Sequence, residues 1–248
     1  MLKIIIPLAG PSEMFQQAGY IYPKPLIEIN GVPMIQLVIE QARDIDEPCQ
    51  FVFIIKEEDS IKFHLDNTLR LLSASCEIVK LKRPTSGSLC SVLMAIDNIN
   101  DDDSLIILNG DQLLDIEYHD VLNFWRSKNA DAGLITFKSV HPRWSYARLE
   151  NERVVQTAEK NPISNNAMVG YYFFAHAATF FKAAFRVIQN DVNFDGSYFT
   201  SPVINEYVLL NKNILQYQID AQAHHSFYSP QMIEEYAKNL TRNEFRTV

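Results

Sequence analysis

The stretch Lys3-Ile4-Ile5-Ile6-Pro7-Leu8 decides the fold class of this chain. It is a continuous apolar run of strand length, and such a run is typical of a strand that is covered on both faces, as in a parallel sheet. Similar runs follow at Gln50–Lys56 and Ser104–Leu108, and Glu77–Leu81 is expected to form a short strand between them. The first half of the chain therefore predicts several buried strands.

Helical spacing of apolar residues separates these strands, in the segments 33–43, 61–74 and 89–99. Residues 9–22 contain no such pattern and are expected to form a loop. An alternation of strand and helix favours a mainly parallel or mixed sheet with helices on both faces. We therefore expect an α/β protein with a Rossmann-like three-layer α/β/α architecture.

The second half is less regular. Strands are expected at 131–138, 168–174 and 214–220, with a strand pair within 148–155, and helices at 177–188, 198–210 and 229–240. No repeat, low-complexity segment or linker interrupts the chain. We predict a single domain over 1–248, with two halves that meet near residue 125.

Composition excludes some classes of function. The chain has 248 residues, 47% of them hydrophobic, and 22 Lys+Arg against 30 Asp+Glu, so its net charge is -8. This acidic balance argues against nucleic acid or anionic membranes as partners, although it allows a local basic pocket. Three cysteines without CxxC spacing indicate a reducing compartment. No apolar run approaches the ~20 residues of a membrane span, so we expect a soluble, cytoplasmic protein.

The loop that leaves the first strand is one candidate for phosphate binding. Leu8, Ala9 and Gly10 follow the carboxyl end of that strand, where backbone N–H groups can face a ligand. Gly10 would let a phosphate come close to the backbone. Taken alone, a glycine after a strand is more typical of a simple turn.

Two other segments carry candidate charged groups. In Tyr22-Pro23-Lys24-Pro25-Leu26, two prolines restrict the backbone around Lys24; alone, this also suits a surface lysine in a rigid turn. In Asn109-Gly110-Asp111, the carboxylate follows a buried strand, at the edge where α/β sheets bind ligands. Asp111 could hold Mg²⁺ there, or could simply be part of an Asn-Gly turn.

Together these segments resemble the sugar-phosphate nucleotidyltransferases, the pyrophosphorylase superfamily, and most of all its short branch that serves capsule and lipopolysaccharide biosynthesis. The resemblance spans nearly the whole chain, because the similar segments follow in order. They are Ala18-Gly19-Tyr20, Pro23-Lys24-Pro25-Leu26, Gly31-Val32-Pro33-Met34-Ile35, Arg83-Pro84-Thr85-Ser86-Gly87-Ser88, Asn109-Gly110-Asp111, Ser145-Tyr146-Ala147, Glu159-Lys160-Asn161-Pro162, Val169-Gly170-Tyr171-Tyr172-Phe173 and Phe227-Tyr228-Ser229-Pro230.

The resemblance implies a nucleotide-diphospho-sugar transferase fold, with a nucleotide-binding half over about 1–125 and an acceptor-binding half over about 126–248. It also implies roles for individual residues. The nucleotide would be bound by Leu8, Ala9, Gly10, Thr85, Gly87 and Ser88, with Gly87 letting the backbone approach the base. Lys24 would contact the reacting phosphates, Asp111 would bind Mg²⁺, and Tyr146, Glu159 and Lys160 would bind the acceptor.

The implied reaction joins a nucleoside triphosphate to a small phosphorylated acceptor. An acceptor phosphate oxygen attacks the α-phosphorus and pyrophosphate leaves, while Lys24, Lys160 and the metal offset the developing negative charge. The acceptor would be a sugar phosphate or another small phosphate, such as an aminoalcohol phosphate. The sequence does not identify the base or the acceptor, and it leaves open whether the chain forms a homo-oligomer.

Two departures from the family pattern keep other functions open. Pro11-Ser12-Glu13-Met14 stands where the family has Arg-Gly-Ser-Arg, so Met14 replaces an arginine that holds phosphates. Ser226 stands where many relatives have a second metal-binding aspartate, a role that His225 or Asp220 could take over. The alternatives are a catalytically impaired nucleotide-binding or regulatory protein, and a related glycosyltransferase that uses a nucleotide sugar.

Overall fold

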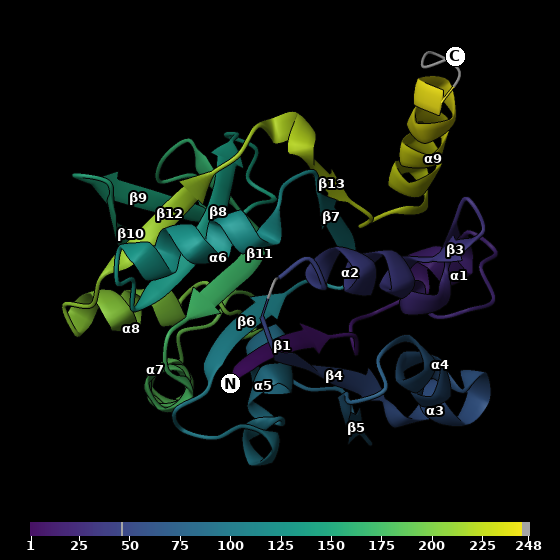
Figure 1. Ribbon diagram of the computed structural model, residues 1–248, viewed down its shortest axis with the longest axis horizontal. Coiled ribbons are helices and arrows are strands. Elements are labelled where there is room, and N and C mark those ends of the chain that lie inside the picture. Colours follow the sequence, from purple (N-terminus) through teal and green to yellow (C-terminus); the bar gives the residue numbers. More distant parts are fainter. Residues whose placement is uncertain (46, 245–248) are drawn as a thin grey trace.

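The computed structural model describes residues 1–45 and 47–244, and it is built on one large mixed sheet (Figure 1). The sheet has nine strands in the order β5-β4-β1-β6-β11-β8-β12-β10-β9. Its first half consists of β1 (Leu2–Pro7), β4 (Cys49–Lys56), β5 (Glu77–Leu81) and β6 (Ser104–Leu108), which run parallel to one another. These are the four strands expected in the first half of the chain, and the predicted α/β class is confirmed.

The second half of the sheet contains most of the antiparallel pairing. β11 (Asn166–Phe174) runs antiparallel to both β6 and β8 (Ala132–Lys138), while β12 (Ile214–Gln218) pairs with β8 in parallel. β10 (Arg153–Ala158) and β9 (Tyr146–Glu150) complete the edge as an antiparallel pair. The two halves of the sheet are thus joined through β6 and β11.

Helices cover both faces of the sheet and give the three predicted layers. One face carries α2 (Met34–Ala42), α4 (Leu65–Leu72) and α6 (Tyr118–Ser127), whose buried side chains share a core with Ile4 and Ile6. The other face carries α5 (Ser88–Leu93), α7 (Ala177–Gln189) and α8 (Val203–Leu209), whose buried side chains share a core with Ile5. Successive strand residues point to opposite faces, so a single strand supplies both cores.

Several predicted helices are shorter or divided. The helix expected at 61–74 is two helices, α3 (Glu57–Phe63) and α4, because His64 adopts a left-handed backbone with φ 54°. The helix expected at 89–99 ends at Leu93 and continues as the 3-10 turn η2 (Ile96–Asn98). In the helix expected at 198–210, only α8 is helical. The loop expected at 9–22 contains a short helix, α1 (Glu13–Gln17).

Other elements have weaker sequence signals. α6, the short hairpin β2 (Glu28–Ile29) and β3 (Val32–Pro33), and the separate pair β7 (Gln112–Leu114) and β13 (His224–Ser226) were not among the predicted elements. The 3-10 turns η1 (Lys24–Leu26) and η3 (Ala221–Ala223) are equally short, and the last described helix is α9 (Pro230–Glu244). Within the described residues, no helix combines the length and apolar character needed to cross a bilayer. The single-domain organisation stays a prediction.

A close contact between α6 and β8 gives a test of the packing. A Cβ added at Gly133 would lie 2.3 Å from the ring of Trp125, which is completely buried. We expect Gly133→Ala to lower the free energy of unfolding by about 1–3 kcal/mol, because a buried indole cannot move aside without disturbing the core. Urea denaturation measures the effect. Gly10→Ala is the control, since a Cβ at Gly10 would meet no atom within 4 Å; equal midpoints for the two variants would contradict the predicted contact.

Candidate active site

The parallel pairing of β1 with β6 brings the first two candidate segments together. Ile5 lies opposite Ile107, so both strands end at the same edge of the sheet. The loop after β1 carries Gly10, and the turn after β6 carries Asp111. The carboxyl ends of adjacent parallel strands are where open α/β sheets bind ligands.

Lys24 reaches the same edge and pairs with Asp111. Its Nζ lies 2.9 Å from the Asp111 carboxylate, although 87 residues separate the two in the sequence. The side chains keep 19% and 28% of their surface exposed, so the pair is accessible from solvent. The flanking prolines are both buried, and the Lys24 backbone N–H donates to the Ser12 hydroxyl at 3.4 Å. The structure thus brings Lys24 and Asp111 together at the edge of the sheet where the loop that carries Gly10 begins, and their role in binding phosphates stays a prediction.

The loop after β1 offers fewer backbone donors than its length implies. The N–H of Leu8 already donates to the Ile54 carbonyl at 2.7 Å, and the Leu8 side chain is buried against Gly110. Ala9 and Gly10 remain, with open space beside Gly10. Met14, which stands at the place of the missing arginine, is 44% exposed and carries no charge.

The segment from Thr85 to Ser88 leads into α5, as expected for a loop that faces a ligand. The structure shows why Gly87 is required there, whereas its predicted approach to a base stays a prediction. Its φ is 113°, and a Cβ at this position would lie 2.3 Å from the backbone oxygen of Tyr198. Backbone hydrogen bonds from Tyr198 to Ser86 and from Leu89 to Tyr198, at 2.8 and 3.1 Å, fix this contact. Gly87 thus allows close approach of another chain segment, and Thr85 caps the turn through its bonds to Gly87 and Ser91.

Glu159 and Lys160 follow β10 and are both held in place. The Glu159 carboxylate accepts hydrogen bonds from the hydroxyls of Ser145 and Ser201, at 2.5 and 2.6 Å. The Lys160 ammonium lies over two aromatic rings, 4.8 Å from the centre of Phe194 and 5.2 Å from that of Phe199. These contacts differ from those of a freely solvated charge pair. Ser145 belongs to a motif noted in the sequence, whereas Ser201, Phe194 and Phe199 had no sequence signal.

Tyr146 lies in the core, where it cannot bind an acceptor as predicted. Its side chain is fully buried and its hydroxyl donates to the His141 carbonyl at 2.6 Å. Strand alternation points Tyr146 into the core on one face of the sheet and the adjacent Ala147 into the core on the other face. The neighbouring Trp144, by contrast, lines a pocket.

His225, considered as a second metal ligand beside Asp111, contacts a different carboxylate. His225 forms a 2.7 Å hydrogen bond with Asp115, on the side of β13 that faces α9. Ser226 is the residue of β13 that lies next to the Asp111 turn, because it pairs with Gln112 and the following Phe227 N–H donates to the Asp111 carbonyl. Asp220, the other residue considered, begins the turn η3.

Asp111 fits a magnesium ion as a single protein ligand. Mg²⁺ commonly binds one or two carboxylates and completes its shell with water and substrate phosphates. One carboxylate oxygen of Asp111 contacts Lys24, which leaves the other available. Within the described residues, the only cluster of three metal-binding side chains is Asp44, Glu117 and His119, at the start of α6. A magnesium ion at Asp111 would therefore need water and substrate phosphates to complete its shell.

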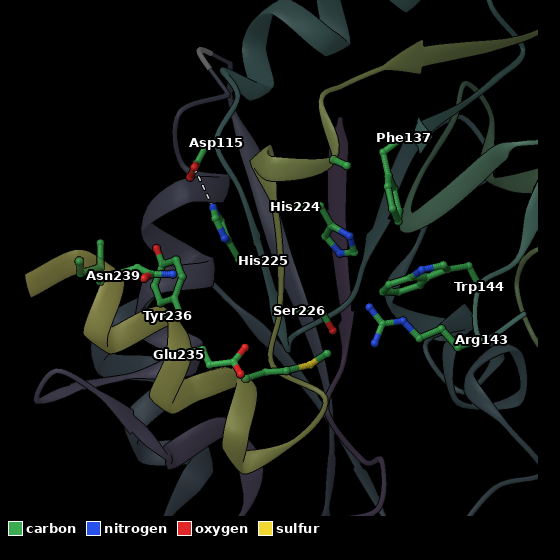
Figure 2. Close-up of a pocket in the computed structure, with 13 residues that line it drawn as sticks. Asp115, Phe137, Arg143, Trp144, His224, His225, Ser226, Glu235, Tyr236 and Asn239 are labelled. Carbon is green, nitrogen blue, oxygen red and sulfur yellow. Dashed lines mark hydrogen bonds and ion pairs between the residues drawn. The ribbon is translucent and has the colours of Figure 1, made fainter. Parts of the chain in front are cut away.

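A pocket of about 350 Å³ lies beside this centre, between β13, α9 and the loop before β9 (Figure 2). Phe137, Trp144 and His224 form one wall, with ring centres 5.1–5.4 Å apart. Burial is the main cause that lowers the pKa of His224 to about 4, and the charges of His225 and Arg143 act in the same direction. Ser226 lines the pocket and pairs with Gln112, so the pocket adjoins the turn that carries Asp111.

Fold and site together define an α/β protein with a charged pair at the carboxyl ends of its parallel strands, and comparisons with known proteins identify its family. Residues 20–191 match the sequence model of the nucleotidyl transferase family, so the chain belongs to that family. A protein of Sulfolobus acidocaldarius, provisionally named a mannose-1-phosphate guanyltransferase, is 22% identical over 177 residues, which are 70% of this chain and 48% of that protein. The chain thus spans about half the length of this relative.

Solved structures share the fold. The nucleoside-diphosphate-sugar pyrophosphorylase of Vibrio cholerae superposes with a TM-score of 0.82 at 24% identity, over 95% of this chain and 99% of that one. A UDP-glucose pyrophosphorylase bound to UDP-glucose gives a TM-score of 0.77 at 16% identity, over 98% and 99% of the two chains. The predicted nucleotide-diphospho-sugar transferase fold is confirmed.

The lowered pKa of His224 predicts how stability depends on pH. The unfolded chain takes up a proton near the ordinary pKa of 6.5, whereas the folded protein does so only near 4. Stability is therefore lost as the pH falls through this window, by about 2–3 kcal/mol at pH 4 relative to pH 7. His224→Phe keeps an aromatic ring in the pocket wall but has no imidazole to protonate. Between pH 7 and pH 4, we expect the free energy of unfolding of this variant, measured with urea, to fall by about 2–3 kcal/mol less than that of the parent. Parallel losses in both proteins would refute the assignment.

Proposed function

We propose that this chain transfers a nucleotidyl group from a nucleoside triphosphate to a small phosphorylated acceptor, with release of pyrophosphate. The observation that carries the proposal is the accessible pair of Lys24 and Asp111 at the carboxyl ends of β1 and β6. A cation and a metal-binding carboxylate at this edge are the groups that a polyphosphate requires. Family membership supports the same reaction class.

The chain's own residues would act mainly by positioning and by charge. Ala9 and Gly10 would offer backbone N–H groups to the triphosphate, and Lys24 would move from Asp111 to the reacting phosphates. Lys160 would hold the phosphate of the acceptor, with Glu159 fixing the turn beside it. Bound Mg²⁺ would neutralise phosphate charge from Asp111.

Further proposals concern the biological setting. We propose a sugar phosphate or an aminoalcohol phosphate as acceptor, a role in surface polysaccharide biosynthesis, and action in the cytoplasm. The provisional name of the Sulfolobus relative and the UDP-glucose complex of a structural neighbour support a sugar phosphate.

A second candidate function rests on Met14. Its exposed thioether and the adjacent exposed Glu13 stand where phosphate-binding charge is expected. Loss of one such group can cost about 10²–10³ in rate, so a nucleotide-binding protein with little turnover is the alternative. Met14→Arg separates the two: activity that appears only in this variant would favour the binding protein.

Removing either member of the central pair tests the proposed reaction. We expect Asp111→Asn and Lys24→Met each to lower kcat/KM for pyrophosphate release by about 10²–10³, because each removes a charge from the phosphate site. A coupled pyrophosphate assay with Mg²⁺, four nucleoside triphosphates and a panel of acceptors provides the measurement. The matched control is the surface pair of Lys80 and Asp66, 2.6 Å apart, where Lys80→Met should leave the rate unchanged. Unaltered turnover in Asp111→Asn would sink the proposal.

The aromatic contacts of Lys160 give an independent test of the acceptor site. We expect Phe199→Leu to raise the KM for the acceptor about three- to fivefold, because the lysine loses a cation–π contact, while the KM for the triphosphate stays the same. Phe199→Tyr keeps a ring face and should behave like the parent. Phe185→Leu, at an exposed position of α7, is the control for general effects. A rise in KM that is equal in the Leu and Tyr variants would show that packing, not the ring, matters.

A further inference from the structure

The pocket beside the catalytic pair contains two opposite charges that do not meet. Arg143, on the loop before β9, and Glu235, on α9, point toward the same opening from opposite sides, with Ser226 between them (Figure 2). Among residues 1–45 and 47–240, whose side chains the structure describes, neither group has an ion-pair partner, and the Arg143 guanidinium lies 4.2 Å from the centre of the Trp144 ring. Both charges are therefore available to a ligand.

The remaining groups of the pocket carry little further charge. Asp115 is already paired with His225, and His224 is neutral at ordinary pH because burial lowers its pKa to about 4. Aromatic rings form the wall behind Arg143. The pocket thus has a positive side at Arg143 and a negative side at Glu235, and its volume of about 350 Å³ is that of a small-molecule site.

The direction of this polarity relates the pocket to the reaction. Ser226, which lies between the two charges, pairs with Gln112, so the pocket adjoins the turn that carries Asp111. Of the two charges, Arg143 would attract the phosphate of an acceptor that reacts at Asp111, in addition to the proposed contact of that phosphate with Lys160. The far end of the acceptor would then lie near Glu235, where a carboxylate favours a cationic group.

We propose that the acceptor is a zwitterion: a small phosphate whose far end carries an ammonium group that pairs with Glu235. This inference rests on the proposed nucleotidyl transfer and goes further, because it names the chemical class of the acceptor. Amino sugar phosphates and aminoalcohol phosphates share the required chemistry. A neutral acceptor would leave the Glu235 carboxylate unpaired.

Two matched pairs of acceptors test the proposal. Glucosamine 1-phosphate is compared with glucose 1-phosphate, and phosphoethanolamine with 2-hydroxyethyl phosphate, each with Mg²⁺ and the four nucleoside triphosphates. We expect kcat/KM for pyrophosphate release to be about tenfold higher for the amine in at least one pair, as for an added charged contact. Glu235→Gln should abolish that preference by raising the KM of the amine alone. Glu234→Gln, on the neighbouring residue that approaches Lys238, should preserve it.

The outcomes separate this proposal from the proposed function. Turnover with neutral acceptors that equals or exceeds turnover with amines, or an unchanged preference in Glu235→Gln, would overturn the zwitterion and leave nucleotidyl transfer standing. If no pair releases pyrophosphate, nucleotidyl transfer fails, and calorimetric binding of the same four phosphates in the presence of each triphosphate decides the ligand class. Tighter binding of amines that Glu235→Gln removes would support the pocket assignment, and equal binding would refute it.

Discussion

The ladder between β1 and β6 is the constraint on which the rest of the site depends. It is parallel, with Leu2 opposite Ser104 and Ile5 opposite Ile107, so the segments that follow both strands leave the sheet at one edge. A slip by one residue would exchange the faces of Ile4, Ile5 and Ile6, and these side chains fill two separate cores. Hydrophobic burial on both faces thus fixes the register, and the register places Asp111 within reach of Lys24.

Sequence patterns predicted the elements that one physical signal determines. Lys3–Leu8, Gln50–Lys56 and Ser104–Leu108 are apolar except at their ends because both faces are buried, and each lies in the interior of the sheet. The break at His64 and the short pair β7 and β13 could not be predicted in this way. Their conformations depend on left-handed backbone at one residue and on pairing between segments about 110 residues apart.

The same distinction applies to the candidate site. Lys24 and Asp111 were predictable because each lies in a restrained segment with its own signal, and the structure brings them together at 2.9 Å. Tyr146 and His225 were misplaced because strand alternation decides which side a residue faces, and a motif alone does not state it. Gly87 was predicted from a motif to allow a close approach to its backbone. The close neighbour in the structure is the backbone of Tyr198, which the motif does not indicate.

The three cations beside the proposed reaction path are restrained in two ways, with different consequences for binding. Lys24 contacts a carboxylate, so it must exchange one negative partner for another when a phosphate arrives. Lys160 and Arg143 lie on aromatic rings, which orient a cation without neutralising its charge. A phosphate that meets these two groups gains a full charge interaction at little cost in side-chain entropy. In the proposed reaction, this arrangement favours the acceptor phosphate, and it offsets part of what the chain lacks at Met14.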